Sequence, residues 1–189
     1  MSLRIYGHRP IQTLPGLETR PTPSRVRQAV FNMLYERVAG SRWLDLCAGS
    51  GAMGAEALCR QCREVVAVEQ SAAACRVIRG NWQPLLQPEQ TMQVYQGDVR
   101  LILKRLVAIG KPFDLIYFDP PYASSLYDEV LPGIPDLLTP EGILIVEHDR
   151  HRLLPTTQGS LSADPPRRYG QTALTLFRWS SGPHEEICT

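Results

Sequence analysis

The sequence predicts an α/β domain built on an open, mostly parallel sheet with an antiparallel strand near the C-terminus. Three observations lead to this prediction. Short apolar runs alternate with helical patterns between residues 42 and 147, a glycine-rich segment follows the first run, and an acidic residue closes each of several runs in succession. With 189 residues, of which 43% are hydrophobic, the chain can bury one full core, so we expect a single domain.

The first part of the chain is expected to be an arm and a helix. Residues 1–21 contain several Pro and Gly residues and are expected to be extended. Thr22 or Ser24 is expected to cap a helix that runs to about Val38, because apolar residues recur on one helical face. We therefore divide the chain into a basic arm and helix (1–40), a main domain (41–180) and a tail (181–189).

The main domain is expected to alternate strands and helices. Strands are predicted at Arg42–Leu46, Glu64–Val68, Met92–Tyr95, Phe113–Phe118 and Gly142–Glu147. Helices are predicted after the glycine-rich segment and over Ser71–Trp82, Asp98–Ala108 and Ser125–Leu131. Residues 155–166 are expected to be a loop, Arg167–Trp179 one or two antiparallel strands, and residues 180–189 a frayed end.

A glycine-rich turn follows the first predicted strand. Gly49, Gly51 and Gly54 match the pattern G-x-G-x-x-G, in which backbone N–H groups at a helix start approach a ligand. Glu69 closes the next strand about 20 residues after the first of these glycines, where Rossmann-like folds place an acid that binds a ribose. A glycine-rich turn alone is weak support for a ligand site, and Glu69 strengthens it.

The most informative stretch is Asp119-Pro120-Pro121-Tyr122, which follows a predicted buried strand. The Asp119 carboxylate and the Pro120 carbonyl can each accept one hydrogen from a planar amine, and Tyr122 can stack on the ring that carries it. The prolines fix φ and remove competing donors. Asp45, Glu69, Asp98 and Asp119 would then meet at the carboxyl edge of the sheet, where such folds bind ligands, and Glu147 ends a further strand.

These residues resemble the S-adenosylmethionine-dependent methyltransferases that act on exocyclic amines. More narrowly, the chain resembles the RsmD type of small-subunit (16S) ribosomal RNA guanine-N2 methyltransferases. That resemblance extends from about Arg4 to Trp179 and depends most on Arg20–Leu34, on the order of the later motifs and on Arg168–Leu174. The chain departs from the family pattern at Tyr6–Ile11, where the family usually has a basic loop of the type Gly-Gly-x-x-x-Gly.

The resemblance implies a Rossmann-like methyltransferase fold with a seven-stranded, mostly parallel sheet and S-adenosylmethionine as cofactor. It implies a catalytic corner made of Asp119, Pro120, Pro121 and Tyr122. The expected cofactor-binding residues are Thr22, Asp45, Ala48, Gly49, Ser50, Gly51, Glu69, Gln70, Asp98 and Val99. The expected substrate-binding residues are Arg9, Arg20, Arg25, Arg27 and Tyr127, and the expected partner is ribosomal RNA in the small subunit or in an assembly intermediate.

The distribution of charge favours a nucleic-acid partner, although the net charge of +1 does not. Residues 1–42 carry seven Arg and two acidic residues, whereas residues 43–150 carry nine Lys and Arg and fourteen acidic residues. A basic arm on an acidic body is what a phosphate-binding attachment would look like, and Arg binds phosphate bidentately. The alternative interpretation is a solvated basic face.

Composition also bears on location and on metals. No apolar run is long enough to span a membrane and no leader pattern opens the chain, so we expect a cytoplasmic protein without a membrane partner. Most of the five Cys residues fall inside predicted elements, which suits reduced thiols. Cys59 and Cys62 have no second pair at metal spacing, so no metal is expected.

Other functions stay open at this point. The same cofactor could serve transfer to N6 of DNA adenine, to a protein glutamine or to a small molecule, although a small molecule would not need an Arg-rich arm. A dehydrogenase would use the glycine pattern, but it would not need the Asp-Pro-Pro-Tyr corner. A non-catalytic RNA-binding module would not need an intact set of acidic strand ends.

Overall fold

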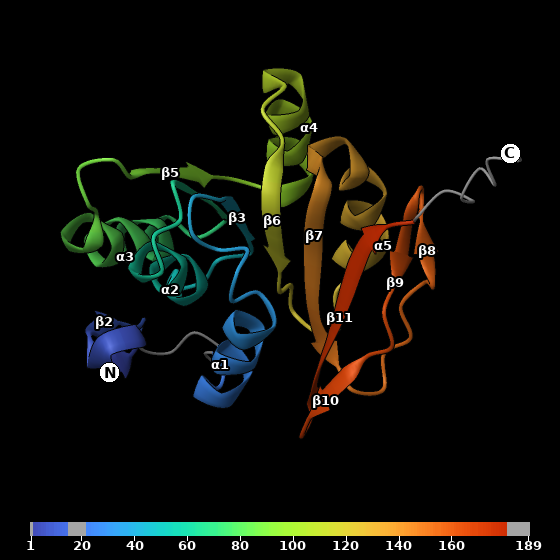
Figure 1. Ribbon diagram of the computed structural model, residues 1–189, viewed down its shortest axis with the longest axis horizontal. Coiled ribbons are helices and arrows are strands. Elements are labelled where there is room, and N and C mark those ends of the chain that lie inside the picture. The colour runs from blue at the N-terminus through green and yellow to red at the C-terminus, as the bar shows by residue number, and fades with distance from the viewer. Residues whose placement is uncertain (1, 15–21, 181–189) are drawn as a thin grey trace, which may run out of the picture.

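The structure is a computed structural model that describes residues 2–14 and 22–180. Five parallel strands form the centre of one sheet, in the order β5-β4-β3-β6-β7, and β11 pairs antiparallel with β7 (Figure 1). The bounds of these strands are Arg42–Leu46 (β3), Glu64–Glu69 (β4), Thr91–Gln96 (β5), Phe113–Phe118 (β6), Leu138–Asp149 (β7) and Thr172–Trp179 (β11). The predicted fold class is therefore confirmed.

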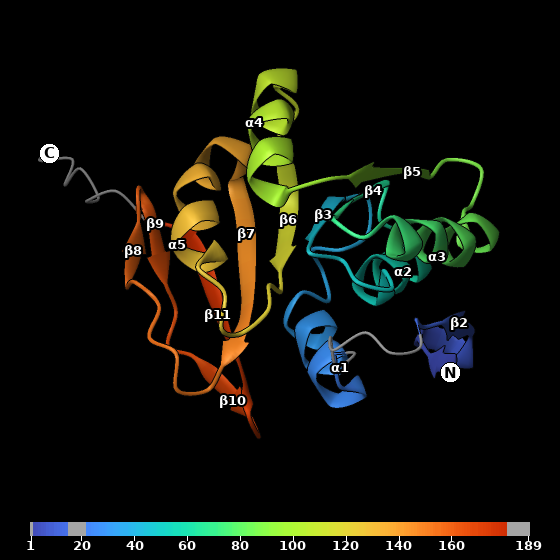
Figure 2. The same cartoon turned by 180° about the vertical axis from the view of Figure 1, so that it is seen from behind.

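Helices cover both faces of the sheet. Helices α1 (Ser24–Met33), α2 (Ala52–Cys59) and α3 (Ala72–Trp82) pack on one face through a core that includes Trp43 and Leu115. Helices α4 (Val99–Ile109) and α5 (Leu126–Val130) pack on the other face around Ile116. Figure 2 shows α4 and α5 in front of β6 and β7. Strands buried on both faces explain why their sequences are continuously apolar.

The described residues give nine strands in this sheet rather than the predicted seven. Two extra strands, β8 (Thr157–Gln158) and β9 (Leu161–Ala163), form a small hairpin where a loop was expected. Leu161 is fully buried and pairs with Trp179, so one apolar side chain anchors this polar segment to β11. Strand β10 (Arg167–Tyr169) forms a hairpin with β11, as the alternation predicted. The path of paired strands ends at β5 and at the two-residue β8, and β10 is a further outer strand that pairs with β11.

The N-terminal segment is a hairpin rather than an extended arm. Strands β1 (Ser2–Arg4) and β2 (Pro10–Gln12) pair antiparallel across a 3-10 turn at Tyr6–His8. The backbone N–H of Tyr6 donates to Glu56 Oε2 at 3.1 Å, and that of Gln12 donates to Asn81 Oδ1 at 2.8 Å. These bonds dock the hairpin on α2 and α3, and residues 15–21 of the expected arm lie outside the described residues.

Helix α1 is shorter than predicted and begins differently. It ends at Met33 rather than near Val38, and Pro23 occupies the position before its first turn, without a side-chain cap. The predicted cap, Thr22, instead directs its hydroxyl to Asp119. Further single 3-10 turns lie at Gln83–Leu85, Leu131–Gly133 and Pro135–Leu137. None of the described helices is long and apolar enough to cross a membrane.

Candidate active site

The site lies at the carboxyl ends of β3 and β6, the two adjacent strands from which the chain winds in opposite directions. From β3 the chain proceeds through α2 and α3 to β4 and β5, and it then crosses through α4 to β6 on the other side. Adjacent crossovers diverge at such a point and leave a crevice for a ligand. The backbone N–H of Asp119 donates to the carbonyl of Leu46 at 3.3 Å, so the two strand ends touch.

The turn after β3 has the backbone conformation that glycine permits. Positive φ angles occur at Cys47 (63°), Gly49 (56°) and Gly51 (74°). A Cβ atom on Gly51 would lie 2.8 Å from Trp82 Nε1, whereas one on Gly49 would have no atom within 4 Å. Gly51 is thus fixed by packing against α3, and the open space beside Gly49 lets a ligand approach the backbone.

Glu69 at the end of β4 faces this turn. Its Oε2 accepts from the backbone N–H of Gly49 at 2.9 Å, and its Oε1 accepts from the N–H of Ser71 at 2.8 Å. Each carboxylate oxygen has a second lone pair, so Glu69 could also accept from a ligand hydroxyl. Ala48 and Ser50 are half-buried on the same turn, and Gln70 is exposed next to Glu69.

Asp45 supports the turn from beneath. It is only 2% exposed, and its Oδ2 accepts from the backbone N–H of Gly54 in the first turn of α2 at 3.1 Å. Burial raises the pKa of Asp45 well above its ordinary value; the Gly54 hydrogen bond opposes this, and the charge of Glu69 adds to it. Asp45 therefore holds the turn against the helix rather than presenting a free carboxylate.

The Asp119 carboxylate lies at the centre of the site. Thr22 Oγ1 donates to Asp119 Oδ2 at 3.4 Å, which brings the segment before α1 to the site. Burial raises the pKa of Asp119 well above its ordinary value, and the charges of Glu147 and Asp45 raise it further. Pro120 is buried behind it, whereas Pro121 is exposed.

Tyr122 and Glu147 form a hydrogen-bonded cluster beside Asp119. Tyr122 Oη donates to Glu147 Oε1 at 3.2 Å and lies 2.9 Å from Thr172 Oγ1. These two contacts orient the Tyr122 ring, and the Tyr122 side chain is 38% exposed. Tyr117 Oη donates to the other oxygen of Glu147. Burial raises the pKa of Glu147, and these phenols oppose the shift. From the sequence, Glu147 is recognisable only as a strand end, and the apolar run that precedes it is the signal for its burial.

Tyr127 supports the corner from inside the protein. It is fully buried, so the structure contradicts its predicted role as a substrate contact. Its hydroxyl donates to the carbonyl of Glu147 at 3.0 Å and more weakly to that of Pro120 at 3.4 Å. The Pro120 carbonyl thus keeps a lone pair for another donor.

Asp98 has a structural partner. It caps α4 by accepting from the backbone N–H of Arg100 at 2.9 Å, and it forms an ion pair with the Arg100 side chain, which also binds Glu129. The Arg100 hydrogen bonds lower the pKa of Asp98 to about 2. Val99 follows in the buried first turn of the helix. A contact between Asp98 and an adenine stays a prediction.

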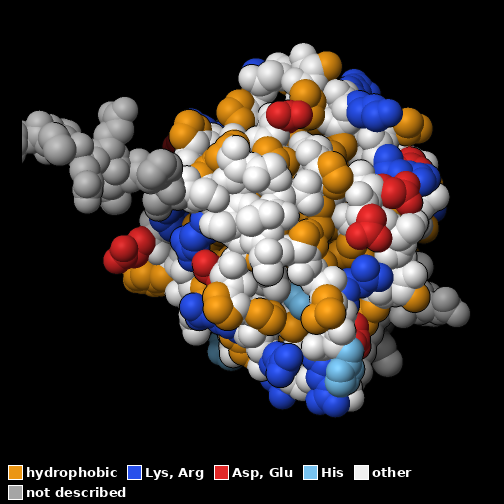
Figure 3. All heavy atoms as spheres, turned by 90° about the vertical axis from the view of Figure 1, so that its right-hand side faces the viewer, with side chains coloured by type: hydrophobic (Ala, Val, Ile, Leu, Met, Phe, Trp, Pro, Cys, Tyr) orange, Lys and Arg blue, Asp and Glu red, His pale blue; other side chains and the backbone are white. Residues whose placement is uncertain are grey.

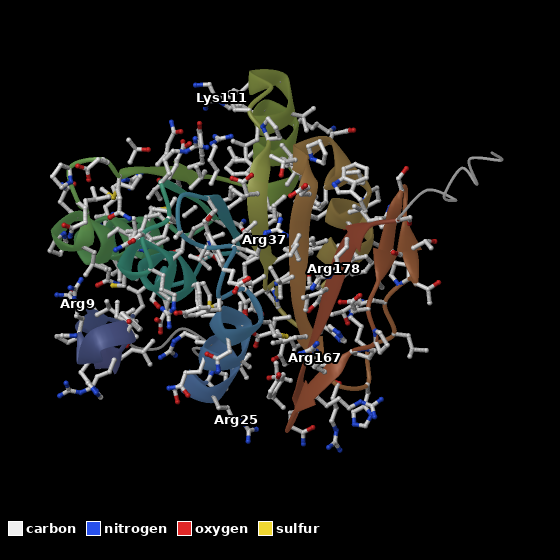
Figure 4. The ribbon with its side chains drawn as sticks, viewed as in Figure 1. Arg9, Arg25, Arg37, Lys111, Arg167 and Arg178 are labelled. Carbon is white, nitrogen blue, oxygen red and sulfur yellow. The ribbon has the colours of Figure 1, made fainter. Side chains whose placement is uncertain are left out.

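The predicted substrate arginines separate in the structure. Arg27 is buried and donates to the carbonyls of Thr22 and Arg4, each at 2.7 Å, and to Glu56 at 3.3 Å, so it is not the phosphate ligand that the sequence predicted. Its position on the inner face of α1 explains this. Arg9 and Arg25 are exposed but lie on different parts of the surface (Figure 4). Arg20 lies outside the described residues.

The chain is similar in sequence to known proteins over most of its length. The model of the family described as "Conserved hypothetical protein 95" matches residues 3–178. The chain belongs to this family. It is the RsmD-type family that the residues predicted. Nothing among the described residues groups three or more His, Cys, Asp or Glu side chains in a way that could hold a metal ion.

Members of the family and one solved structure match most of the chain. The chain is 32% identical to the "Putative rRNA methyltransferase YlbH" of Bacillus subtilis, with 90% of this chain and 93% of that protein covered. It is 30% identical to the "Ribosomal RNA small subunit methyltransferase D" of Escherichia coli K12, with 89% and 83% covered. The structure titled "Putative methyltransferase yhhF from Escherichia coli" superposes with a TM-score of 0.82 at 28% identity, with 96% and 100% covered.

Proposed function

We propose that this protein transfers a methyl group from S-adenosylmethionine to the exocyclic N2 amine of a guanine in small-subunit ribosomal RNA. One observation carries the proposal: the corner Asp119–Tyr122 lies directly beside the glycine turn, joined through the 3.3 Å bond from Asp119 to Leu46. The names of the relatives in Bacillus subtilis and Escherichia coli support ribosomal RNA as the acceptor.

The residues present fit the proposed cofactor. The space beside Gly49 is open, and Glu69 can accept hydrogen bonds from ribose hydroxyls. The carboxyl groups of Asp45, Asp119 and Glu147 give the site a negative electrostatic potential. Such a site favours a cation. When bound, S-adenosylmethionine supplies a methyl group on a positively charged sulfur that departs as a neutral thioether. Thr22, Ala48–Gly51, Gln70 and Val99 border the same edge and are proposed as further cofactor contacts.

The corner would orient the acceptor amine. Asp119 and the Pro120 carbonyl would each accept one amine hydrogen, which favours a pyramidal nitrogen and directs its lone pair toward the methyl group. Positioning of this kind can contribute several orders of magnitude in rate. The methylated nitrogen is strongly acidic, and Asp119, whose pKa is raised, is suited to accept the proton that it loses.

Tyr122 would hold the base. A guanine inside folded RNA must leave its stack to reach a pocket at the end of a strand. The partly exposed ring of Tyr122, fixed through its hydroxyl by Glu147 and Thr172, offers a flat surface for that base. Stacking on an aromatic side chain contributes about 1–3 kcal/mol.

The test is transfer of labelled methyl from S-adenosylmethionine to small subunits that lack the modification, followed by nucleoside analysis. Wild-type protein should place the label in N2-methylguanosine. Asp119→Ala should reduce transfer by about a thousandfold or more, because positioning and proton acceptance are both lost. Its affinity for S-adenosylhomocysteine should stay within a few-fold of wild type.

Other results would redirect the proposal. Cofactor binding without label in ribosomal RNA would move the acceptor to another planar amine, such as N6 of DNA adenine or a protein glutamine. Loss of cofactor binding in Asp119→Ala would make Asp119 a structural residue instead.

A further inference from the structure

A group of basic side chains surrounds the exposed side of the catalytic corner. We call it the basic rim; its residues are Arg25, Arg150, His151, Arg152, Arg167 and Arg168. They come from the start of α1, the turn after β7, and β10. Figure 4 shows Arg25 and Arg167 at the same end of the molecule and Lys111 at the opposite end. Figure 3 shows Lys, Arg and His side chains gathered along the lower part of the face that it presents.

Hydrogen bonds join the three segments of the basic rim. Arg25 Nη2 donates to the carbonyl of Tyr169 in β10 at 3.0 Å. The backbone N–H of Arg150 donates to the carbonyl of Gln171, in the turn between β10 and β11, at 2.9 Å. The rim is therefore one continuous surface, although Arg25 lies more than 100 residues from its other members in the chain.

Arg152 connects the basic rim to the catalytic corner. Its Nη2 donates to the carbonyls of Tyr122 and Ser124, each at 3.1 Å, and its guanidinium lies 4.1 Å from the centre of the Tyr127 ring. A polyanion bound on the rim would thus reach the corner where Tyr122 is exposed.

The guanidinium groups of the basic rim have no carboxylate partner within ion-pair distance among residues 2–14 and 22–180. By contrast, Arg27, Arg42 and Arg100 are neutralised by Glu or Asp side chains elsewhere in the fold. Asp149 lies within the rim, but its Oδ1 accepts from the backbone N–H of His151. Arg side chains without a carboxylate partner can bind the phosphates of a nucleic acid bidentately, with release of counterions.

The N-terminal arm fits this role less well. Arg27 is buried, Arg4 donates to the carbonyl of His8, and Arg9 lies beside Cys59 of α2, at the side of the molecule away from Arg167 (Figure 4). We propose that the basic rim, formed mainly by the turn after β7 and by β10, binds the phosphate backbone of folded RNA and delivers the target base to Tyr122. This inference rests on the proposed function and names the surface that it would use.

The test uses the full chain with a matched pair of double variants. Arg167→Glu/Arg168→Glu reverses two charges on the exposed strand of the rim. Arg63→Glu/Lys111→Glu makes the same change in net charge at the amino ends of the parallel strands, where both side chains are exposed. Deproteinised small-subunit ribosomal RNA is the probe, and affinity is measured by filter binding over a range of salt concentrations. S-adenosylhomocysteine binding and thermal unfolding report on the fold.

The rim variant should bind the RNA at least tenfold more weakly at moderate salt. The slope of log affinity against log salt should fall by about two, because two phosphate contacts are lost. Cofactor affinity should not change, and the control variant should lose less than threefold in RNA affinity. A conservative double variant, Arg167→Lys/Arg168→Lys, should bind the RNA more tightly than the rim variant but less tightly than wild type. The reason is that Lys keeps the charge and lacks the bidentate fork of Arg.

Two results would overturn the inference. Equal losses in both double variants would mean that only total charge matters. A loss confined to protein-containing ribosomal particles, with binding to deproteinised RNA unchanged, would make the rim a protein-binding surface. Failure of wild-type protein to bind the deproteinised RNA would also overturn the inference. If wild-type protein binds S-adenosylhomocysteine but does not methylate small subunits that lack the modification, the proposed function itself fails, which is a distinct outcome.

Discussion

Several individual residues of the site are carboxyl groups that the fold buries. Asp45, Asp119 and Glu147 are carboxyl groups drawn into one region, and burial raises the pKa of each. Few hydrogen bonds offset that burial at Asp119, where Thr22 is the one hydroxyl group that donates to the carboxylate among the described residues. Strained or electrostatically unfavourable groups are typical of functional sites, since their cost is carried by the rest of the fold.

Replacement of Asp119 by Asn should therefore stabilise the fold in a pH-dependent way. Because the pKa of Asp119 is raised in the folded state, the stability linked to its proton is complete below the ordinary carboxyl pKa and is lost as the pH rises through the raised pKa. Asp119→Asn removes this loss, so its melting temperature should exceed that of wild type by a few degrees at pH 8, and the difference should shrink toward pH 4. Thermal unfolding of both proteins across this range measures it.

An exposed acid provides the control for that experiment. Asp136→Asn should follow wild type at every pH, because Asp136 is on the surface. A stabilisation by Asp119→Asn that is equal at pH 4 and pH 8 would contradict the argument, since it would show that the effect does not depend on the charge of residue 119.

At the scale of elements, the packing of α2 against α3 fixes the glycine turn. Trp82 of α3 donates from Nε1 to the carbonyl of Gly51 at 2.7 Å, and its ring covers the first turn of α2. A Cβ atom on Gly54 would lie 2.2 Å from Trp82 Cζ2 and 2.8 Å from Val65 Cγ2. The third glycine of the pattern is thus required by close contact between a helix, its neighbour and a strand.

Gly54→Ala should destabilise the protein by about 1–3 kcal/mol, because the buried Trp82 ring must move. Gly80→Ala is the matched control: Gly80 lies inside α3, and a Cβ atom there would meet nothing within 4 Å. That control should stabilise the protein by about 0.5–1 kcal/mol, because alanine has less backbone freedom to lose than glycine in a helix. Urea unfolding of the two variants would compare them, and similar values for both would refute the packing argument.

At the scale of the whole molecule, the reactivity of the buried cysteine thiols measures unfolding of the whole domain. Cys62 and Cys75 are fully buried, and burial raises the pKa of Cys62 to about 12. At pH 8 Cys62 would then be almost entirely the unreactive thiol. Iodoacetamide should modify both residues only as the protein unfolds, whereas half-buried Cys59 should react at lower urea concentrations. Peptide mass spectrometry after labelling pulses measures this order, and rapid labelling of Cys62 in the absence of urea would contradict it.

Much of this molecule could be predicted from its sequence, because the sheet is buried on both faces. Phe113–Phe118 is a strand with the predicted bounds, and Ser71 and Asp98 cap the helices that they were expected to begin. The hairpin at residues 2–12 was missed because bonds to distant Glu56 and Asn81 hold it. Arg27 was misassigned for the same reason: charge in the sequence does not reveal that an arginine faces Glu56 in the interior.

The candidate site, too, was predictable from the sequence only in part. The acids at the strand ends were recognisable because parallel strands bring their carboxyl ends to one edge. The hydrogen bonds of Tyr122 with Glu147 and Thr172 were not recognisable, since they depend on the register of antiparallel β11, in which Leu174 pairs with Glu147. The basic rim depends on that pairing as well, because it brings β10 to the site.

The edges of the sheet bear on how the protein behaves at high concentration. An unpaired edge strand offers a template on which another chain can add and aggregate. On β5, Gln93 and Gln96 are exposed, and Arg79 Nη2 occupies the carbonyl of Val94 at 2.9 Å, so a hydrogen-bond acceptor at this edge is already taken. The opposite edge, β8, is only two residues long. The path of strands from β5 to β8 is thus protected at both ends against the addition of intermolecular strands.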